Sequence, residues 1–517
     1  MKTAQNPAEF YKEYQKGVDY NRSIGLYETV RRNENFYNDH QWEGVNAPDL
    51  EKPVFNFLKT VVNYYVAMIV SDDIAAEVSL KSPAKSGREE KMLRILSAQF
   101  EDVIEQVRLK QKQRVMLRDA AVDGDGCLYF YFDPDAPTGQ DAAGAVFAEN
   151  IDNTNVIFSN PSVSDVQKQP YLYLVSRRPA GEVQQEARIC GVPEEEIGKI
   201  RPDGAGEPAA ADGLSGDSLC TVLLRLWKEN GRVWCAKSTR EALLRAPFDT
   251  GCTLYPVAWM SWERVKNSCH GQSAISGKIP NQIMVNKLYA MAMQYVKQLA
   301  FPKLIFDRSK ISRWNSRIGE AIGVQGNPQE AVAAAFSAGD MSEQVFTLID
   351  QTVTRTKELM GASDAALGNI IPQNTSAILA VQKAASVPLE LNRMDFYQFT
   401  EDCVRILLDM MRAYYGVRKV CWTDENGGAR SGEFDFSVLG DYALKLQVDI
   451  GASAYWSELK QVQTLDSLFE KGILTDAALY LENIPDGYVK NRHKLIAALK
   501  ERAKEQPREA APGEKTA

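Results

Sequence analysis

A succession of helical patterns between Gly271 and Gly416 constrains this chain more than any other feature. Apolar residues recur at helical spacing in a first stretch that stops before Pro302, and again from about Met341 to Met360. A third pattern runs from Thr375 to Tyr415, which corresponds to about 60 Å of helix at 1.5 Å per residue. Two helices joined by an insert and followed by a very long helix are an unusual order for an enzyme.

The segments between these helices carry residues that interrupt regular structure. The insert 301–340 contains several Gly residues and is predicted to be irregular, and residues 363–376 form a loop by composition. The long helix contains Pro388, which lacks a backbone N–H and is therefore expected to kink it.

The rest of the chain mixes helical and strand patterns, so the expected fold class is α+β and mostly helical. Apolar periodicity predicts helices over Tyr20–Trp42, Phe57–Ser71 and Glu89–Val122, and small helices from Trp456 to Ala498. Aromatic and β-branched runs predict strands over Cys127–Phe132, Val156–Phe158, Tyr171–Ser176, Val417–Trp422 and Ala443–Val448. A hairpin is predicted to join Val222–Trp227 to Arg232–Ala236, and the tail 500–517 is predicted to be disordered.

Composition excludes several classes of protein. A net charge of −8 argues against a simple basic nucleic-acid binder, because such proteins need an excess of Lys and Arg. The eight cysteines include no C-x-x-C pair and fit reduced thiols better than a disulfide scaffold. The N-terminus has no apolar signal-peptide core, and the apolar stretch Val61–Val70 is too short to cross a bilayer. We therefore expect a cytosol-like compartment and no membrane anchor.

Motifs for catalysis are incomplete. The segment Gly271–Lys278 resembles a phosphate-binding loop, but it has five residues between its glycines, and Ile279 stands where Ser or Thr would bind magnesium. The turn Asp123–Gly126 lacks the further ligands of a calcium loop. Cys269 and His270 are adjacent, which is poor spacing for one metal ion and fits a loop before a helix. We expect no enzyme activity, no cofactor and no metal site.

Two groups of basic residues remain. One lies in the insert, where only Asp307 opposes a set that comprises Lys303, Arg308, Lys310, Arg313 and Arg317. In an acidic chain, this local positive charge indicates either a partner-facing surface or a solvated segment. The other group is expected to be a solvated helix face, with phosphate or partner contact as the alternative, and comprises Arg108, Lys110, Lys112, Arg114 and Arg118.

Four stretches of the chain resemble portal proteins of tailed bacteriophages. They are the aromatic-Gln-Trp segment Phe36–Gly44; Tyr255–Val257 with Trp262, Gly271, Ile279–Gln282 and Asn286; Asp364–Asn369 with Asn374–Ala377; and Glu458–Pro485. Each pattern is weak alone, but their order along the chain is fairly specific. The resemblance implies a portal fold that assembles as a ring around a central channel.

The resemblance also implies a division of the chain into parts. A wing would comprise residues 1–265 and the strands at 417–452, and two stem helices would lie at 266–300 and 341–362. The clip would span 301–340, the tunnel loop 363–376, the long kinked helix 377–416, and the crown helices 453–499. Stem stripes are apolar because a stem helix packs on neighbours on two sides. A third side faces the channel, and we interpret polar interruptions of the stripes in that way: Gln282, Asn286, Gln294 and Lys297.

The implied function is that of the portal vertex subunit, through which phage DNA is packaged and ejected. Its partners would be about eleven further copies of itself, double-stranded DNA, terminase, a head–tail adaptor, and the major capsid and scaffolding proteins. Terminase and adaptor would dock on the basic clip residues. The tunnel loop carries one charge and many amide or small side chains, and its expected DNA-facing residues are Asp364, Leu367, Asn369, Gln373 and Asn374.

The expected location is the unique capsid vertex of the virion, after assembly in the host cytoplasm. An acidic or neutral tunnel would let DNA slide without being gripped. Two alternatives stay open. The chain could be another head–tail connector or scaffold ring component, although such a long helix is not expected in one. It could also be a packaging nuclease or ATPase, but the incomplete phosphate-binding loop argues against that.

Overall fold

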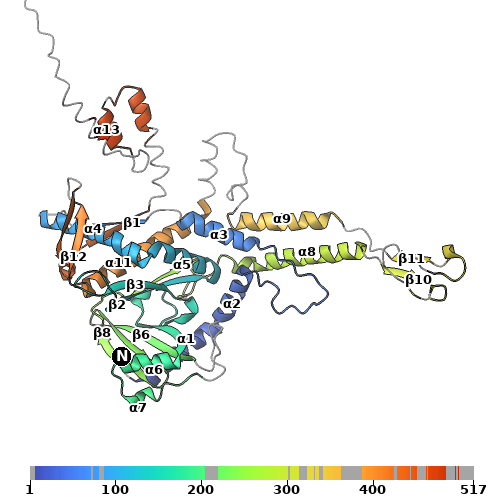
Figure 1. Ribbon diagram of the computed structural model, residues 1–517, viewed down its shortest axis with the longest axis horizontal. Helices are drawn as coiled ribbons and strands as arrows, with labels where there is room; N and C mark the ends of the chain where they lie inside the picture. Colours follow the sequence, from blue (N-terminus) through green and yellow to red (C-terminus); the bar gives the residue numbers. More distant parts are fainter. Residues whose placement is uncertain are drawn as a thin grey trace, which may run out of the picture. The chain divides into compact units, whose positions relative to one another are not determined.

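Helices and strands are mixed along the chain, which confirms the α+β class (Figure 1). Two compact units are formed, the first by Met1–Val70 with Val78–Leu446 and the second by Ser71–Glu77 with Gln447–Ala517. The computed structural model describes residues 6–70, 74–80, 87–203, 219–300, 303–311, 313, 323–330, 332–336, 342–362, 387–423, 428–442, 444–450, 462, 464–474, 476–484, 495–496 and 499.

Three helices form the N-terminal part of the first unit: α1 (Pro7–Ser23), α2 (Leu26–Tyr37) and α3 (Phe57–Val70). The single helix predicted over Tyr20–Trp42 is wrong. Gly25 adopts a left-handed φ of 69°, which only glycine takes up without strain, and this residue separates α1 from α2.

The helix predicted over Glu89–Val122 is also two helices, α4 (Gly87–Val107) and α5 (Leu109–Asp123). Arg108 interrupts it with a φ of 54°, a conformation that its sequence pattern does not reveal. By contrast, α3 confirms the helix predicted over Phe57–Ser71, and its apolar stripe is buried as expected.

Two antiparallel sheets follow. In the first, β2 (Asp125–Asp133) lies between β3 (Ala145–Asn150) and β9 (Val257–Ser261). The second has the order β4-β5-β6-β7-β8, with bounds Val156–Phe158, Tyr171–Pro179, Leu219–Glu229, Arg232–Ser238 and Leu243–Asp249. The strands predicted within β2, β4 and β5 are confirmed, whereas β3, β8 and β9 have no counterpart among the predictions.

The predicted hairpin is confirmed by the pairing of β6 with β7. Its two turn residues, Asn230 and Gly231, have φ values of 51° and 77°, which a two-residue hairpin turn requires. Both faces of this sheet are covered, because alternate residues of β5 enter different cores. Leu172 packs on one face, while Tyr173 packs on the other beneath Phe10 of α1. Two helices, α6 (Ala180–Ile189) and α7 (Glu194–Ile197), contribute a third core.

The central part of the chain contains the two shorter predicted helices, α8 (Ile279–Ala300) and α9 (Gln344–Leu359). The insert between them is not wholly irregular as predicted. β10 (Lys303–Phe306) and β11 (Val332–Phe336) pair antiparallel, because short apolar runs at the two ends of the insert meet.

The long helix is described from Val387 onward. Pro388 lies in a 3₁₀ turn, η6 (Val387–Leu389), and α11 (Glu390–Tyr414) begins directly after it. Pro388 thus comes directly before α11, and the kink predicted at this residue stays a prediction. Residues 377–386 lie outside the described residues.

Further strands follow α11 along the chain. β12 (Val417–Thr423) pairs with β13 (Ala429–Asp435), which was not predicted, and the 3₁₀ turn η7 (Phe436–Asp441) follows. β14 (Leu444–Ile450), which confirms the strand predicted over Ala443–Val448, pairs with β1 (Ile74–Leu80).

In the second unit, the predicted small helices are found at 464–470 and in α13 (Ala477–Glu482). The tail 500–517 lies outside the described residues. Across the described parts of the chain, every helix is too short or too polar to span a lipid bilayer.

Candidate functional site

The α8–α9 pair is the candidate site, because the described basic residues of the insert lie between these helices in sequence and the predicted tunnel loop follows α9 directly. In Figure 1, α9 runs alongside α8. Near the start of α8, the amide of Asn281 donates to Thr356 Oγ1 of α9 at 2.9 Å. Ile349 of α9 is 1% exposed, and α9 packs against α8.

The base of α8 is anchored by buried polar side chains. Gln282 and Asn286 are 0% and 2% exposed, although we interpreted both as facing a channel. Gln282 donates to the Phe55 carbonyl at 2.8 Å and to Asn286 Oδ1 at 3.0 Å. Asn286 in turn donates to Gln41 Oε1 at 2.6 Å. The channel interpretation of Gln282 and Asn286 is therefore wrong, since both bind other parts of their own chain.

The other two polar interruptions of α8 differ from these. Gln294 is exposed, while Lys297 forms an ion pair with Glu51. Phe55, which follows Glu51 in the same segment, stacks on Tyr289 with ring centroids 4.0 Å apart. The segment between α2 and α3 thus contacts α8 along more than one turn.

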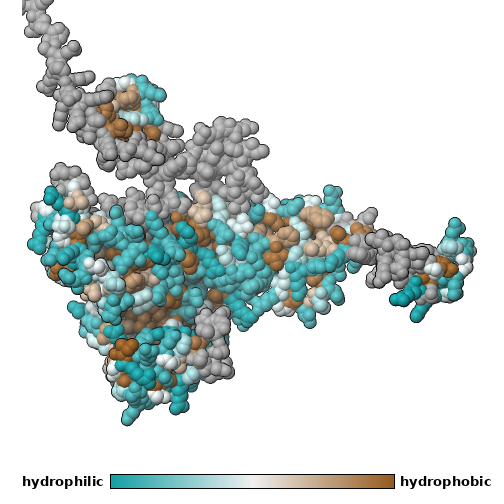
Figure 2. Space-filling view, viewed as in Figure 1, coloured by the Kyte–Doolittle hydropathy of each residue, from teal (hydrophilic) through white to brown (hydrophobic). Residues whose placement is uncertain are grey.

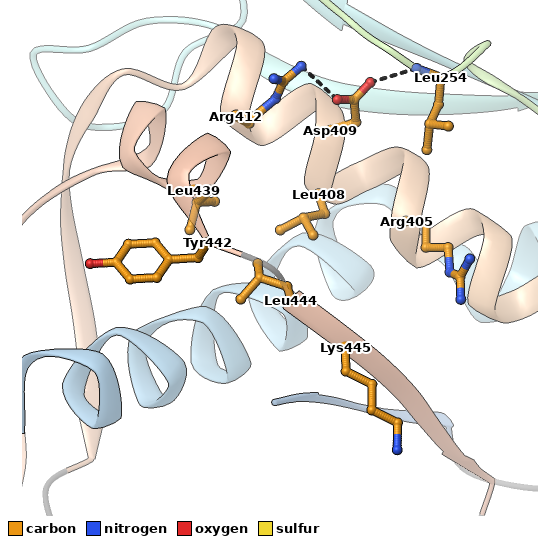
Figure 3. A pocket seen from close by; sticks show the side chains of 9 residues that line it. All are labelled: Leu254, Arg405, Leu408, Asp409, Arg412, Leu439, Tyr442, Leu444 and Lys445. Carbon is orange, nitrogen blue, oxygen red and sulfur yellow. Dashed lines mark hydrogen bonds and ion pairs between the residues drawn. The ribbon is translucent and has the colours of Figure 1, made fainter. Parts of the chain in front are cut away.

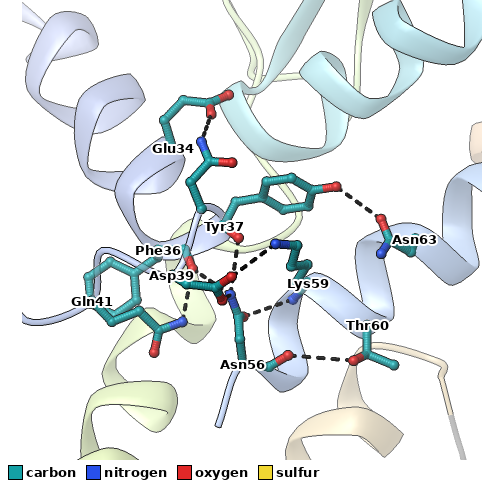
Figure 4. Close-up of polar contacts among 10 residues, drawn as sticks. Glu34, Phe36, Tyr37, Asp39, Gln41, Asn56, Lys59, Thr60 and Asn63 are labelled. Atoms are coloured by element: carbon teal, nitrogen blue, oxygen red, sulfur yellow. Dashed lines mark hydrogen bonds and ion pairs between the residues drawn. The ribbon is translucent and has the colours of Figure 1, made fainter. Parts of the chain in front are cut away.

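Gln41 is held in place by the α2–α3 connection (Figure 4). Its amide donates to the Phe36 carbonyl at 2.8 Å, and Asn56 donates to the same carbonyl at 2.8 Å and to Asp39 Oδ1 at 2.7 Å. The amide of Asn56 and the ammonium of Lys59 hold the pKa of Asp39 below its usual value. Two of the segments that carry the family resemblance, Phe36–Gly44 and Ile279–Asn286, therefore meet in one hydrogen-bonded network.

A buried ion pair fixes the chain just before α8. The Nδ1 atom of His270 lies 2.9 Å from Asp125 Oδ2, and the other oxygen of Asp125 accepts from the Gly271 N–H at 2.8 Å and from Ser261 Oγ at 2.7 Å. Burial alone would lower the pKa of His270, but hydrogen bonding and the charge of Asp125 outweigh it and raise the pKa to about 9. The imidazole is therefore charged at neutral pH.

The expectation that residues 269–278 form a loop and turn before a helix is confirmed, since the 3₁₀ turn η4 (Ser276–Lys278) leads into α8. Sequence reasoning missed the ion pair, because His270 and Asp125 are 145 residues apart. From the sequence, Asp125 is recognisable only as part of the turn after α5.

A cluster of carboxylates on α2 and α5 was also missed. Oxygens of Glu34, Asp119 and Asp123 lie within 4.8 Å of one another. Arg118 forms ion pairs with Glu34 and, at 2.9 Å, with Asp119, so its guanidinium already provides a positive charge for this carboxylate cluster. Burial raises the pKa of Asp123, with the nearby Glu34 as a further cause. Arg118 thus belongs to an internal ion pair and not to a solvated face, whereas Arg108 and Arg114 are exposed as expected.

The basic residues of the insert are partly described. Arg308 and Arg313 are exposed, Lys310 is half-buried, Lys303 begins β10, and Arg317 lies outside the described residues. Asp307 accepts from the Ser309 N–H at 2.9 Å and from its hydroxyl at 2.6 Å, which lowers the pKa of the carboxyl. Asp307 is thus used to form the turn after β10.

The predicted tunnel-loop residues lie outside the described residues: Asp364, Leu367, Asn369, Gln373 and Asn374. Gly361 and Pro388 flank the stretch 363–386, which contains this loop and lies outside the described residues, and these two flanks lie together. Gly361 has a φ of 73°, and a Cβ placed on it would be 2.6 Å from Cβ of Pro388. The hydroxyl of Tyr65 donates to the Met360 carbonyl, and the Tyr65 ring stacks on Trp262. α3 and the segment after β9 therefore hold the point from which the loop leaves.

Exposed apolar side chains form a further feature of α8 and α9, visible as brown patches along the pair in Figure 2. Met291 and Met293 of α8 are 61% and 41% exposed, and Phe346 and Leu348 of α9 are 46% and 43% exposed. Successive residues turn by about 100° around a helix, so members of each pair point to nearly opposite sides. The periodicity of the helices was predicted, but the exposure of these residues was not.

Residues 221–436 match the family model of the phage P22-like portal protein. This stretch runs from β6 to the start of η7 and includes α8, the insert, α9 and α11. No curated protein matches the chain. The family match supports the resemblance to phage portal proteins described above, over residues 221–436.

Proposed function

We propose that this chain is a phage portal protein, and that it assembles through α8 and α9 into a ring of about twelve copies whose channel carries phage DNA into and out of the capsid. α8 and α9 would be the stem, residues 301–340 the clip and residues 363–376 the tunnel loop. A phage portal is a structural component of the capsid, and the proposed role requires no catalytic group. We also propose the remaining assignments that the resemblance implies, with residues 1–265 and 417–452 as the wing and residues 453–499 as the crown.

The exposed apolar residues on opposite sides of the stem carry this proposal. A large apolar side chain left in water costs free energy, and contiguous exposed apolar surface commonly marks a protein interface. A helix that contacts a partner on one side only needs one exposed apolar face. Met291 and Met293 give α8 two exposed apolar faces, and Phe346 and Leu348 give α9 two. A ring places one neighbour on each side of every subunit, and therefore covers both faces.

The anchored base supports the same arrangement. Gln282 and Asn286 fix α8 to the rest of the subunit, so that the far half of the helix is held in a defined direction. The insert, with the exposed Arg308 and Arg313, follows that far half. We propose it as the docking site for terminase and then for the head–tail adaptor, and the tunnel loop as the segment that lines the DNA path.

Assembly is tested with the double variant Met291→Glu, Met293→Glu of the full chain, by mass photometry and negative-stain microscopy. We expect the wild-type chain to form rings and the variant to remain monomeric, because charges would be buried on both sides of α8. The matched control is Gln294→Glu, which adds a charge at an exposed polar position of the same helix and should leave rings intact. A wild-type chain that stays monomeric, or a double variant that still forms rings, would sink the proposal.

Docking is tested separately. The variant Arg308→Glu, Arg313→Glu should form normal rings but bind the cognate terminase at least tenfold more weakly, because opposite charges at an exposed interface become like charges. The control Lys287→Glu reverses an exposed charge on α8, outside the insert. If both variants bound terminase with equal affinity, these arginines would not be part of the terminase interface.

A further inference from the structure

A cavity in the first unit lies apart from the stem, between α11, η7 and the start of β14 (Figure 3). Its volume is about 330 Å³, at the lower end of the range for small-ligand sites. Leucine side chains form its apolar part: Leu254, Leu408, Leu439 and Leu444. Three of these are only partly buried, so apolar surface remains available to an occupant.

One wall of the cavity is built by Asp409, which is 8% exposed. Its carboxylate accepts from the backbone N–H groups of Thr253 at 2.6 Å and Leu254 at 2.9 Å, and from Thr253 Oγ1 at 3.0 Å. Arg412 donates to the same carboxylate at 2.8 Å and to the Gly251 carbonyl at 3.1 Å. These bonds hold Leu254 against α11, so the cavity exists before any ligand arrives.

The charge around the cavity is positive. Arg405, Arg412 and Lys445 line it, against Asp409 as the single lining carboxylate. Asp409 is already satisfied by its own hydrogen bonds. Arg405 forms an ion pair with Glu401 but is exposed, and Lys445 is exposed at the start of β14. In Figure 3, the Arg405 and Lys445 side chains lie on the same side of Leu408 and Leu444, away from Tyr442.

We propose that this cavity binds an apolar carboxylate, with its hydrocarbon part among the leucines and its carboxylate between Arg405 and Lys445. The leucine lining selects the apolar part, and the two exposed cations select the negative charge over a neutral polar group. Such a group can come from a free aliphatic acid or from adjacent apolar and acidic side chains of a peptide. The inference does not depend on ring assembly, since every lining residue lies outside α8, α9 and the insert.

The test is calorimetric titration of the full chain with octanoate and with the neutral octanamide. We expect octanoate to bind at least tenfold more tightly than octanamide. The variant Arg405→Gln, Lys445→Gln should lose that preference, and Leu408→Gln should weaken both ligands. Lys287→Gln, which removes an exposed charge on α8, is the control and should behave as wild type. Thermal unfolding of each variant checks that the fold is retained.

Three results of these titrations would contradict the proposed carboxylate site. No octanoate binding, equal affinity for octanoate and octanamide, or an unchanged preference in the Arg405→Gln, Lys445→Gln variant would each overturn the proposal. A second titration with the peptide acetyl-Leu-Leu-Glu-amide distinguishes the sources. Tighter binding of the peptide than of octanoate assigns the site to a protein segment, and tighter binding of octanoate assigns it to a free acid.

Discussion

The two halves of α8 differ in a way that reverses the usual distribution of side chains. At the base, the polar residues Gln282 and Asn286 are buried and hydrogen-bonded. In the far half, the apolar residues Met291, Met293 and Val296 are 61%, 41% and 58% exposed. Ordinary folding of an isolated chain favours the opposite distribution, because apolar burial stabilises and polar burial costs free energy.

Under the proposed function, the two halves of α8 serve different partners. The base faces its own subunit, where a directional network of amides fixes position and orientation as well as stability. Under the proposed function, the far half faces other subunits and keeps its apolar surface for them. The helix is thus both an anchor and an interface, and substitutions in its two halves should have separable effects.

The largest expected effect is at the base. Asn286→Ala removes the donor to Gln41 Oε1 and one acceptor of the Gln282 amide, and both of these side chains are buried. We expect the free energy of unfolding to fall by about 3–5 kcal/mol, measured by denaturant titration at a concentration where the chain is monomeric. Gln294→Ala on the same helix is the control and should change it by less than about 0.5 kcal/mol. Equal effects would show that the network does not anchor α8.

The next effect tests the anchorage of the loop that follows α9. Gly361→Ala places a Cβ 2.6 Å from Cβ of Pro388 and forces a non-glycine residue into a φ of 73°. Together these should cost about 2–3 kcal/mol in the same unfolding measurement. Gly277→Ala is the matched control, because a Cβ added there would meet no atom within 4 Å and its φ is not positive. A harmless Gly361→Ala would mean that the two flanks separate readily.

A pH-dependent effect of similar size concerns the charged His270 before α8. Its folded pKa, about 9, is above the ordinary value of 6.5, so its contribution to stability is complete below about pH 6.5. That contribution should be lost as the pH rises through 9, and it should amount to about 3 kcal/mol. The check is the unfolding free energy of wild type and His270→Gln between about pH 6 and 9.5. The difference between the two proteins should shrink with rising pH, and a constant difference would contradict the assignment.

Sequence patterns predicted those parts of the molecule that local rules determine. The α8 and α9 stripes follow helical periodicity, and Asn230-Gly231 specifies its hairpin turn through positive φ values. The break at Arg108 was missed, because a left-handed arginine is imposed by tertiary packing and has no local signal. β13 was missed because its alternating charged and small residues match no strand pattern.

The candidate site was predicted less well than the fold around it. The segment Phe36–Gly44 and the start of α8 were both recognised, but nothing in either reveals that Gln41 meets Asn286. Polar residues on a helix stripe fit a channel wall or a buried network equally well, and only the position of distant backbone groups decides between them. The same holds for His270, whose partner Asp125 lies in a distant strand.

The smallest expected effect is on the monomer, in the far half of α8. Met293→Gln replaces an exposed apolar side chain with a polar one of similar length, so the free energy of unfolding of the monomer should change by less than about 0.5 kcal/mol. In the assembled protein, the same substitution should raise the concentration at which rings dissociate, because the side chain would then be buried against a neighbour. The Asn286→Ala substitution should do the reverse and weaken the monomer most. If Met293→Gln cost the monomer more than about 1 kcal/mol, Met293 would be packed within its own subunit, and the contrast between the two halves of α8 would disappear.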